Sequence, residues 1–272
     1  MIYEFRIKSI LVFLAFIALS ACVTTANKSV NDFKEEFSNR YASYVVIADP
    51  MIMKYRPFPT AKKTTDMLIK TIVNGRSEIK AAHIESAAKI TKMGDNLLYQ
   101  GSSTVEGYDL TVTKLMKETG EILNTEVSVE DAALTEKQRE KIKELEESLA
   151  AYLPVYRSDG LKTGDNLFAD REEIRMSSSG FSFSLKLMGE VKGLATFRQR
   201  PSILVNLDGR YRIISSLPKF DVQGWMMLDV ETGVATQMSL RMSVTFTGNY
   251  KKTSLEIYTI TELHLPPLTV SN

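Results

Sequence analysis

The sequence predicts a mainly β protein with a few helices, built from strongly twisted antiparallel sheets of half-barrel or sandwich-like form and covered by helices. Apolar and polar residues alternate through residues 234–246, which is the period of a strand with one apolar face. Turn-forming residues separate several such runs. A single clear helical pattern, at residues 135–152, divides them.

The amino-terminal segment has the three parts of an export signal. Arg6 and Lys8 supply positive charge, an apolar run follows at residues 10–19, and two small residues precede Cys22. The run is about half the roughly 20 residues that a helix needs to cross the hydrocarbon core. We therefore expect a removable signal rather than a permanent transmembrane helix.

Residues 19–22 read Leu-Ser-Ala-Cys, which is the general form of a lipobox. The segment therefore resembles the signal peptides of bacterial lipoproteins, whose cysteine thiol receives a diacylglyceryl group before cleavage and acylation of the new amino terminus. The resemblance implies that residues 1–21 are removed and that Cys22 carries the lipid. Two or three acyl chains give a stable membrane anchor, whereas one holds only marginally. The mature domain resembles no specific family.

A lipidated Cys22 also agrees with the cysteine count, because it is the only cysteine in the chain and a lone free thiol is a liability in an oxidising compartment. Val23 follows it. In lipoproteins of Gram-negative bacteria an aspartate at that position commonly signals retention in the inner membrane. For such a host, the resemblance implies the periplasmic side of the cell outer membrane.

The mature chain is expected to be electrically neutral. Removal of residues 1–21 takes two basic residues and one acidic residue from totals of 34 and 33, which leaves 32 of each. Proteins that bind nucleic acid usually carry a net positive charge. A neutral domain lacks that charge, so nothing in the composition favours a nucleic-acid partner. The short basic pairs, such as Arg198 with Arg200, are interpreted as solvated strand ends.

The first half, residues 31–154, is predicted to be β-rich. Residues 22–30 are small and polar, as in a flexible tether, and an aromatic stripe over residues 31–44 predicts a helix that packs on the body. Three prolines in residues 49–60 predict an extended segment that covers a sheet edge. Residues 79–90 fit both a strand face and a helix face, and the neighbouring strands favour a strand.

A hairpin turn and a helix complete this half. The sequence KETGE at residues 117–121 predicts a turn between strands 110–116 and 122–129. Thr135 and Gln138 form a capping box, leucine and isoleucine residues recur with helical spacing, and Pro154 ends the pattern. The predicted helix at residues 135–152 marks the boundary with the second half, residues 155–272, which is predicted to be an antiparallel β unit.

Two turns and one long strand are predicted in the second half. The Asp208-Gly209 pair predicts a two-residue hairpin turn, and residues 229–235 predict another. The strand at residues 234–246 would extend about 43 Å at about 3.3 Å per residue. Its apolar face must be covered by helices, another sheet or a ligand.

The sequence shows no catalytic, metal or cofactor motif. Only two histidines are present, His83 and His264, and His264 is expected to be a surface residue. Asp221 and Asp229 could form a catalytic carboxylate pair only if the fold brought them together in a cleft.

We therefore expect a non-enzymatic, lipid-anchored envelope protein that acts as a binding or assembly factor. Its partners would be the membrane, an apolar or lipid ligand, and an envelope protein. The methionines at positions 226, 227, 238 and 242 would suit an adaptable apolar surface, although plain core packing is the more common role for such residues. The alternatives are a carboxylate-dependent hydrolase and a passive structural adaptor.

Overall fold

The computed structural model describes residues 43–267 apart from residues 74, 106–107, 131–134, 137–138, 141–152, 169–173, 179–180, 214–218 and 249–250. The predicted signal and tether, with Cys22, lie outside the described residues. So do nearly all of the predicted helix at 31–44 and most of the predicted helix at 135–152.

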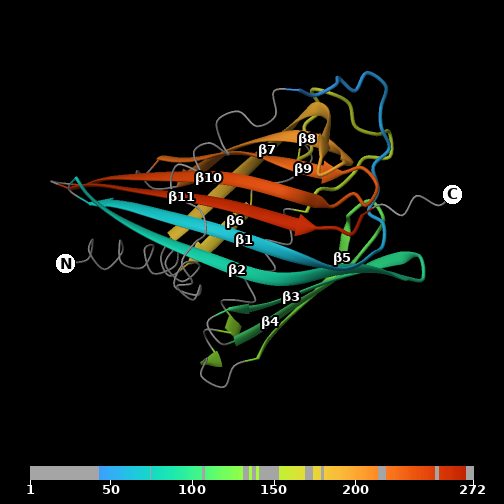
Figure 1. Cartoon of the computed structure of the whole chain (residues 1–272). Helices are drawn as coiled ribbons and strands as arrows, with labels where there is room; N and C mark the ends of the chain where they lie inside the picture. Colours follow the sequence, from blue (N-terminus) through green and yellow to red (C-terminus); the bar gives the residue numbers. More distant parts are fainter. Residues whose placement is uncertain are drawn as a thin grey trace.

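One antiparallel sheet joins the strands of the described residues (Figure 1). Its eleven strands, in chain order, are β1 (Phe58–Val73), β2 (Arg76–Met93), β3 (Asn96–Val105), β4 (Tyr108–Met116), β5 (Ile122–Glu130), β6 (Ile174–Ser178), β7 (Phe181–Phe197), β8 (Arg200–Ile213), β9 (Lys219–Asp229), β10 (Ala235–Gly248) and β11 (Lys251–His264).

The first and last strands meet in the middle of this sheet. The spatial order is β5-β4-β3-β2-β1-β11-β10-β9-β8-β7-β6, so every neighbouring pair except β1 with β11 is also consecutive in the chain. The exception pairs Leu68 with Tyr258 and Lys62 with His264. The sheet curves, and β6 and β7 pass behind the central strands in Figure 1.

Two extended segments, residues 43–57 and 153–168, cross one end of the sheet, and we call them the first and second strap. Met51 and Leu161 exchange two backbone hydrogen bonds of 2.9 Å, which join the straps to each other. The amides of Tyr55 and Tyr156 donate to Glu118 and Thr119 in the turn between β4 and β5, both at 2.7 Å. We call this end of the sheet the strap end.

The main hydrophobic core lies at the strap end, between the straps and one face of the sheet, which we call the core face. It contains Ile47, Met53, Tyr55, Tyr156 and Leu161 from the straps, and sheet residues that include Phe58, Ile90, Leu97, Met116, Val191, Ile203, Val205, Met226, Leu228 and Leu263. The other face of the sheet, which bears Lys62 and His83, is the outer face.

The fold-class prediction is wrong. It expected helices to cover the sheet, but in the described part of the chain no helix does so. That part is nearly all antiparallel strand, and its core is closed by the extended straps. Prolines at positions 50 and 57 exclude a helix in the first strap. Backbone pairing with Leu161 and Leu194 gives that strap hydrogen bonds that a helix would otherwise supply.

The predicted turn at Asp208-Gly209 is also wrong, because both residues lie inside β8. Gly209 pairs with Leu187 on β7 and with Val222 on β9, so the strand continues through it. The other turn predictions are confirmed: residues 117–121 connect β4 to β5, and residues 229–235 connect β9 to β10. The choice of strand for residues 79–90 is confirmed by β2, and the long strand is β10.

Candidate functional site

The middle of β10 presents a half-buried apolar strip on the core face. We call Met238, Leu240 and Met242 the methionine strip; all three are partly exposed to solvent. They alternate with Ser239 and Arg241, which point to the outer face because successive side chains of a strand lie on opposite faces. Met238 and Leu240 pack against the edge of the main core, and Met242 continues the apolar core face beyond it.

The strip has an apolar border on β9, whereas β11 places Thr261 opposite Met238 and Thr259 opposite Leu240. Met238 lies opposite Met226, and Met242 lies between Val222 on β9 and Ile257 on β11. Gly224 lies opposite Leu240, and a Cβ atom there would come within 2.0 Å of the carbonyl oxygen of Ser239. A close approach of β9 and β10 at this point thus requires glycine. Methionine is unbranched and polarisable, so such a surface adapts to irregular apolar ligands.

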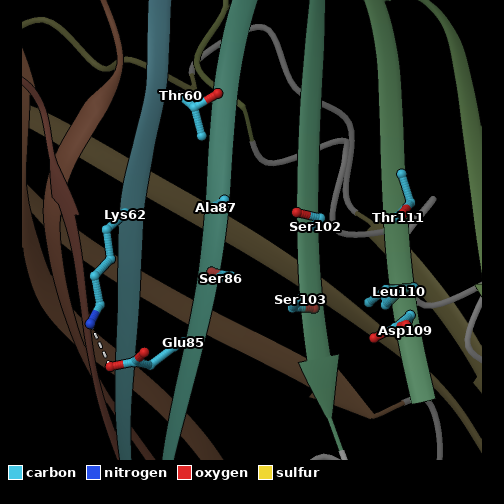
Figure 2. Close-up of a pocket in the computed structure, with 10 residues that line it drawn as sticks. All are labelled: Thr60, Lys62, Glu85, Ser86, Ala87, Ser102, Ser103, Asp109, Leu110 and Thr111. Carbon is cyan, nitrogen blue, oxygen red and sulfur yellow. Dashed lines mark hydrogen bonds and ion pairs between the residues drawn. The ribbon is translucent and has the colours of Figure 1, made fainter. Parts of the chain in front are cut away.

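A second candidate is a polar groove on the outer face of β1 to β4, with a volume of about 660 Å³ (Figure 2). Lys62, Ala87, Ser102 and Thr111 form one row across the four strands. Ala87 and Ser102 have small side chains, so they leave space between the two ends of this row, Lys62 and Thr111. The remaining lining residues are Thr60, Glu85, Ser86, Ser103, Asp109 and Leu110. The lining of this groove mixes polar and apolar atoms, whereas the methionine strip is formed by apolar side chains alone.

A cluster of charged side chains, which includes the lining residues Lys62 and Glu85, forms one side of the groove. His83 Nδ1 is 2.6 Å from Asp66 Oδ1, and Lys62 Nζ donates a 2.5 Å hydrogen bond to Glu85 Oε1. The hydrogen bond to Asp66 raises the pKa of His83 above its usual value, against a smaller opposing effect of burial. The hydrogen bond from Lys62 lowers the pKa of Glu85. The hydrogen bond between Asp66 and His83 therefore favours the protonated form of His83.

A buried ion pair is the most strongly constrained polar feature of the described residues. Arg200 Nε and Nη2 donate to the two carboxylate oxygens of Asp229 at 2.6 and 2.9 Å. The amide and hydroxyl of Thr232 donate to the same carboxylate at 2.8 and 2.7 Å. Burial would raise the pKa of Asp229, but the hydrogen bonds from Arg200 and Thr232 outweigh it and hold that pKa below its usual value.

This pair corrects the interpretation of Arg200 as a solvated strand end, because Arg200 is buried. The pair was missed because its two members are 29 positions apart and neither belongs to a motif. Arg198 does lie at the surface, where its guanidinium donates to Glu262 at 2.7 Å.

The two carboxylates considered for catalysis do not come together. Asp221 and Asp229 lie eight positions apart on β9, which is about 26 Å along a strand. Asp229 is committed to Arg200, and Asp221 is exposed. His264 is exposed, as expected, and lies 2.7 Å from Arg198 Nη1. Partial burial and the charge of Arg198 lower the pKa of His264.

The four methionines proposed as one surface divide between the two faces. Met226, Met238 and Met242 share the core face, whereas Met227 is fully buried on the outer face with Leu204 and Trp225. In the described part of the chain, no group of three or more histidine, cysteine or acidic side chains could hold a metal ion. Within that same part, no helix has the length and apolar character to cross a bilayer.

No protein-family model and no curated protein matches this chain. Among solved structures, a DUF1329 family protein from Desulfovibrio piger aligns with 78% of this chain and 87% of its own, at 7% identity and a TM-score of 0.18. A TM-score this low carries no argument about fold or function.

Proposed function

We propose that this protein is a lipid-anchored lipoprotein of the bacterial envelope that binds an apolar ligand without chemical conversion. The methionine strip carries the proposal. It is an apolar surface in the middle of a large sheet, and its three side chains are only half-buried. The lipobox-like residues 19–22 support the anchor, and Val23 supports the periplasmic side of the outer membrane.

The strip has the chemistry of an acyl-chain site. Each methylene group moved from water to such a surface contributes about 0.8 kcal/mol, so an acyl chain laid along the strip gains affinity without a specific polar contact. Two threonines of β11 lie opposite the strip, Thr259 beside Leu240 and Thr261 beside Met238. The Thr259 hydroxyl can accept or donate a hydrogen bond at the polar end of a lipid, whereas the Thr261 hydroxyl already lies 3.1 Å from the Thr65 hydroxyl.

Binding is favoured over hydrolysis by the position of the carboxylates. The two aspartates that a carboxylate-dependent hydrolase would use are held about 26 Å apart along β9. Asp229 already accepts four hydrogen bonds from Arg200 and Thr232. Such a carboxylate is occupied by its structural partners.

The ligand is tested by organic extraction of protein purified from its native membrane, followed by mass spectrometry of the extract. Non-covalent acyl lipids are expected there, whereas the anchor stays on the protein because it is covalent. An extract without lipid would contradict the binding function.

The anchor is tested by metabolic labelling with radioactive palmitate. Cys22→Ala should abolish the label and release the protein from the membrane fraction, because no other cysteine exists. Val23→Ala, one position away, is the matched control and should keep both. Label or membrane retention that persists in Cys22→Ala would remove the anchor from this account.

A further inference from the structure

Exposed apolar side chains gather at the strap end of the sheet. Where side-chain burial is described, which excludes residues 174–187, 210–220 and 244–253 near the opposite end, nine large hydrophobic residues are exposed, and seven of them are at the strap end. Those seven are Tyr44, Val45, Val46, Ile52, Met93, Leu123 and Val155. The other two are Ile79, near the opposite end of β2, and Met188, on the outer face of β7.

Backbone pairing fixes the seven at one end. Val45 pairs with Leu194, close to the turn between β7 and β8, and Ile52 follows the Met51–Leu161 bridge between the straps. Val155 precedes Tyr156, which is bound to the β4–β5 turn. Met93 ends β2 and Leu123 lies at the start of β5, which places both at the same end of an antiparallel sheet. This end lies on the right in Figure 1.

The fold does not need these side chains for its core. In the first strap, Ile47 and Met53 already turn inward and are buried, whereas Val45 and Val46 are 70% and 63% exposed and Ile52 is 53% exposed. Single exposed apolar side chains are ordinary, but several at one end of a fold are typical of a surface that meets a partner or a membrane.

The charges at the strap end are largely paired with one another. Lys54 lies 3.2 Å from Glu118, and Lys117 lies 2.8 Å from Glu121. Arg157 lies 2.6 Å from Asp159, and Arg56 lies 3.6 Å from Glu231. The end therefore presents apolar side chains among neutralised ion pairs, without a strong field of either sign.

The chain enters the described fold at this same end. Twenty residues separate Cys22 from residue 43, and they span at most about 70 Å even if fully extended. The opposite end of the sheet lies farther from the entry point by a strand length, about 46 Å for the 14 residues of β10. A tethered surface experiences a high effective concentration of its target, so even weak contact becomes populated.

We infer that the strap end is a lipid-contact surface, whose exposed apolar side chains insert into the interface of the bilayer that holds the anchor. This inference rests on the proposed lipid anchor. Insertion is driven by apolar burial, as in other interfacial contacts, and the paired charges make it independent of anionic lipid. The sheet is thereby oriented with its strap end toward the membrane.

The test uses the lipidated full-length product, reconstituted in phosphatidylcholine vesicles that contain brominated acyl chains. An environment-sensitive thiol dye is attached at Val46→Cys or Ile52→Cys, with Ile79→Cys and Met188→Cys as matched exposed apolar controls. The strap-end dyes should shift to the blue and lose fluorescence by quenching, whereas the control dyes should not. Added phosphatidylglycerol should leave the quenching unchanged.

Equal quenching at all four positions, quenching at Ile79 alone, or quenching only with anionic lipid would overturn the inference. Dye labelling of the wild-type protein distinguishes a wrong membrane-contact surface from a missing lipid anchor. Its single cysteine should take no dye if Cys22 is acylated, and dye on the wild-type protein would refute the anchor itself. Circular dichroism of each variant confirms that the sheet is retained.

Discussion

Arg200 and Asp229 form a bidentate, buried ion pair that joins the start of β8 to the turn between β9 and β10. Arg200 Nη1 also donates to the carbonyl oxygen of Pro266 at 3.1 Å, which holds the segment that follows β11. Three parts of the chain therefore meet at one guanidinium group. Desolvation makes such a pair costly to form, and removal of one partner leaves a buried, unpaired charge.

We expect Asp229→Ala to lower the free energy of unfolding by about 3–5 kcal/mol, because Arg200 would remain buried without its partner. Urea denaturation measures the change. Asp221→Ala, at an exposed position of the same strand, is the matched control and should change stability by no more than about 0.5 kcal/mol. Equal losses of stability for the two substitutions would show that the ion pair does not stabilise the fold.

The same pair predicts an acid-sensitive fold. The folded-state pKa of Asp229 is held below its usual value. Its contribution to stability is therefore complete above the unfolded pKa, about 3.9, and is lost as the pH falls through the folded pKa. The urea midpoint should fall in this acidic range more steeply for wild type than for Asp229→Asn. If the urea midpoints of the two proteins fell in parallel as the pH was lowered, the lowered pKa of Asp229 would be contradicted.

The two histidines should titrate on opposite sides of the ordinary histidine pKa of about 6.5. The hydrogen bond to Asp66 raises the pKa of His83, and partial burial with nearby Arg198 lowers the pKa of His264. Nuclear magnetic resonance of the two imidazole rings measures both directly. Asp66→Asn should lower the pKa of His83 and leave that of His264 unchanged.

The raised pKa of His83 also fixes the sign of its effect on stability. Its contribution is fully present below the unfolded pKa and is lost as the pH rises through the folded pKa. His83→Gln should therefore remove a small decline in stability above neutral pH. A larger decline in the variant would reverse the sign and contradict the pairing with Asp66.

Gly233 should be the least replaceable residue of the turn between β9 and β10. Its φ is +70°, and a Cβ atom would lie 2.3 Å from the carbonyl oxygen of Lys54 in the first strap. Gly233→Ala should cost about 1–2 kcal/mol for the left-handed backbone and about 1–3 kcal/mol more for the clash. Thermal denaturation measures the total.

Gly164→Ala provides the control for this clash. Gly164 also has a positive φ, +92°, but open space where a Cβ atom would lie. Its replacement should therefore cost only the backbone contribution of about 1–2 kcal/mol. If both substitutions cost the same, contact between the first strap and the β9–β10 turn is looser than the structure indicates.

Local patterns in the sequence predicted local structure well. Strict alternation of apolar and polar residues identified β10, and Gly120 in the sequence KETGE marked the turn between β4 and β5. The Asp208-Gly209 pair failed as a turn signal because β7 and β9 flank it on both sides, and pairing with both strands overrides the turn preference.

Contacts between distant parts of the chain left no local signal. Leu68 pairs with Tyr258 across 190 positions, and nothing near either residue indicates its partner. The straps were also unexpected as the cover of the core, since three prolines predicted only an extended segment at a sheet edge. For the candidate site, alternation placed Met238 and Met242 on one face, but it could not show that they would be only half-buried.

The central claim, that the core face holds an apolar ligand, is tested most directly by blocking the methionine strip with bulk. We would measure non-covalently bound acyl lipid per mole of purified protein for wild type, Met242→Trp and Met188→Trp. Met188→Trp is the control, because it makes the same replacement at an exposed position of the outer face. The account predicts a loss of about tenfold or more for Met242→Trp, equivalent to at least about 1.4 kcal/mol of binding free energy, and no loss for Met188→Trp. Equal lipid content in all three proteins would contradict it.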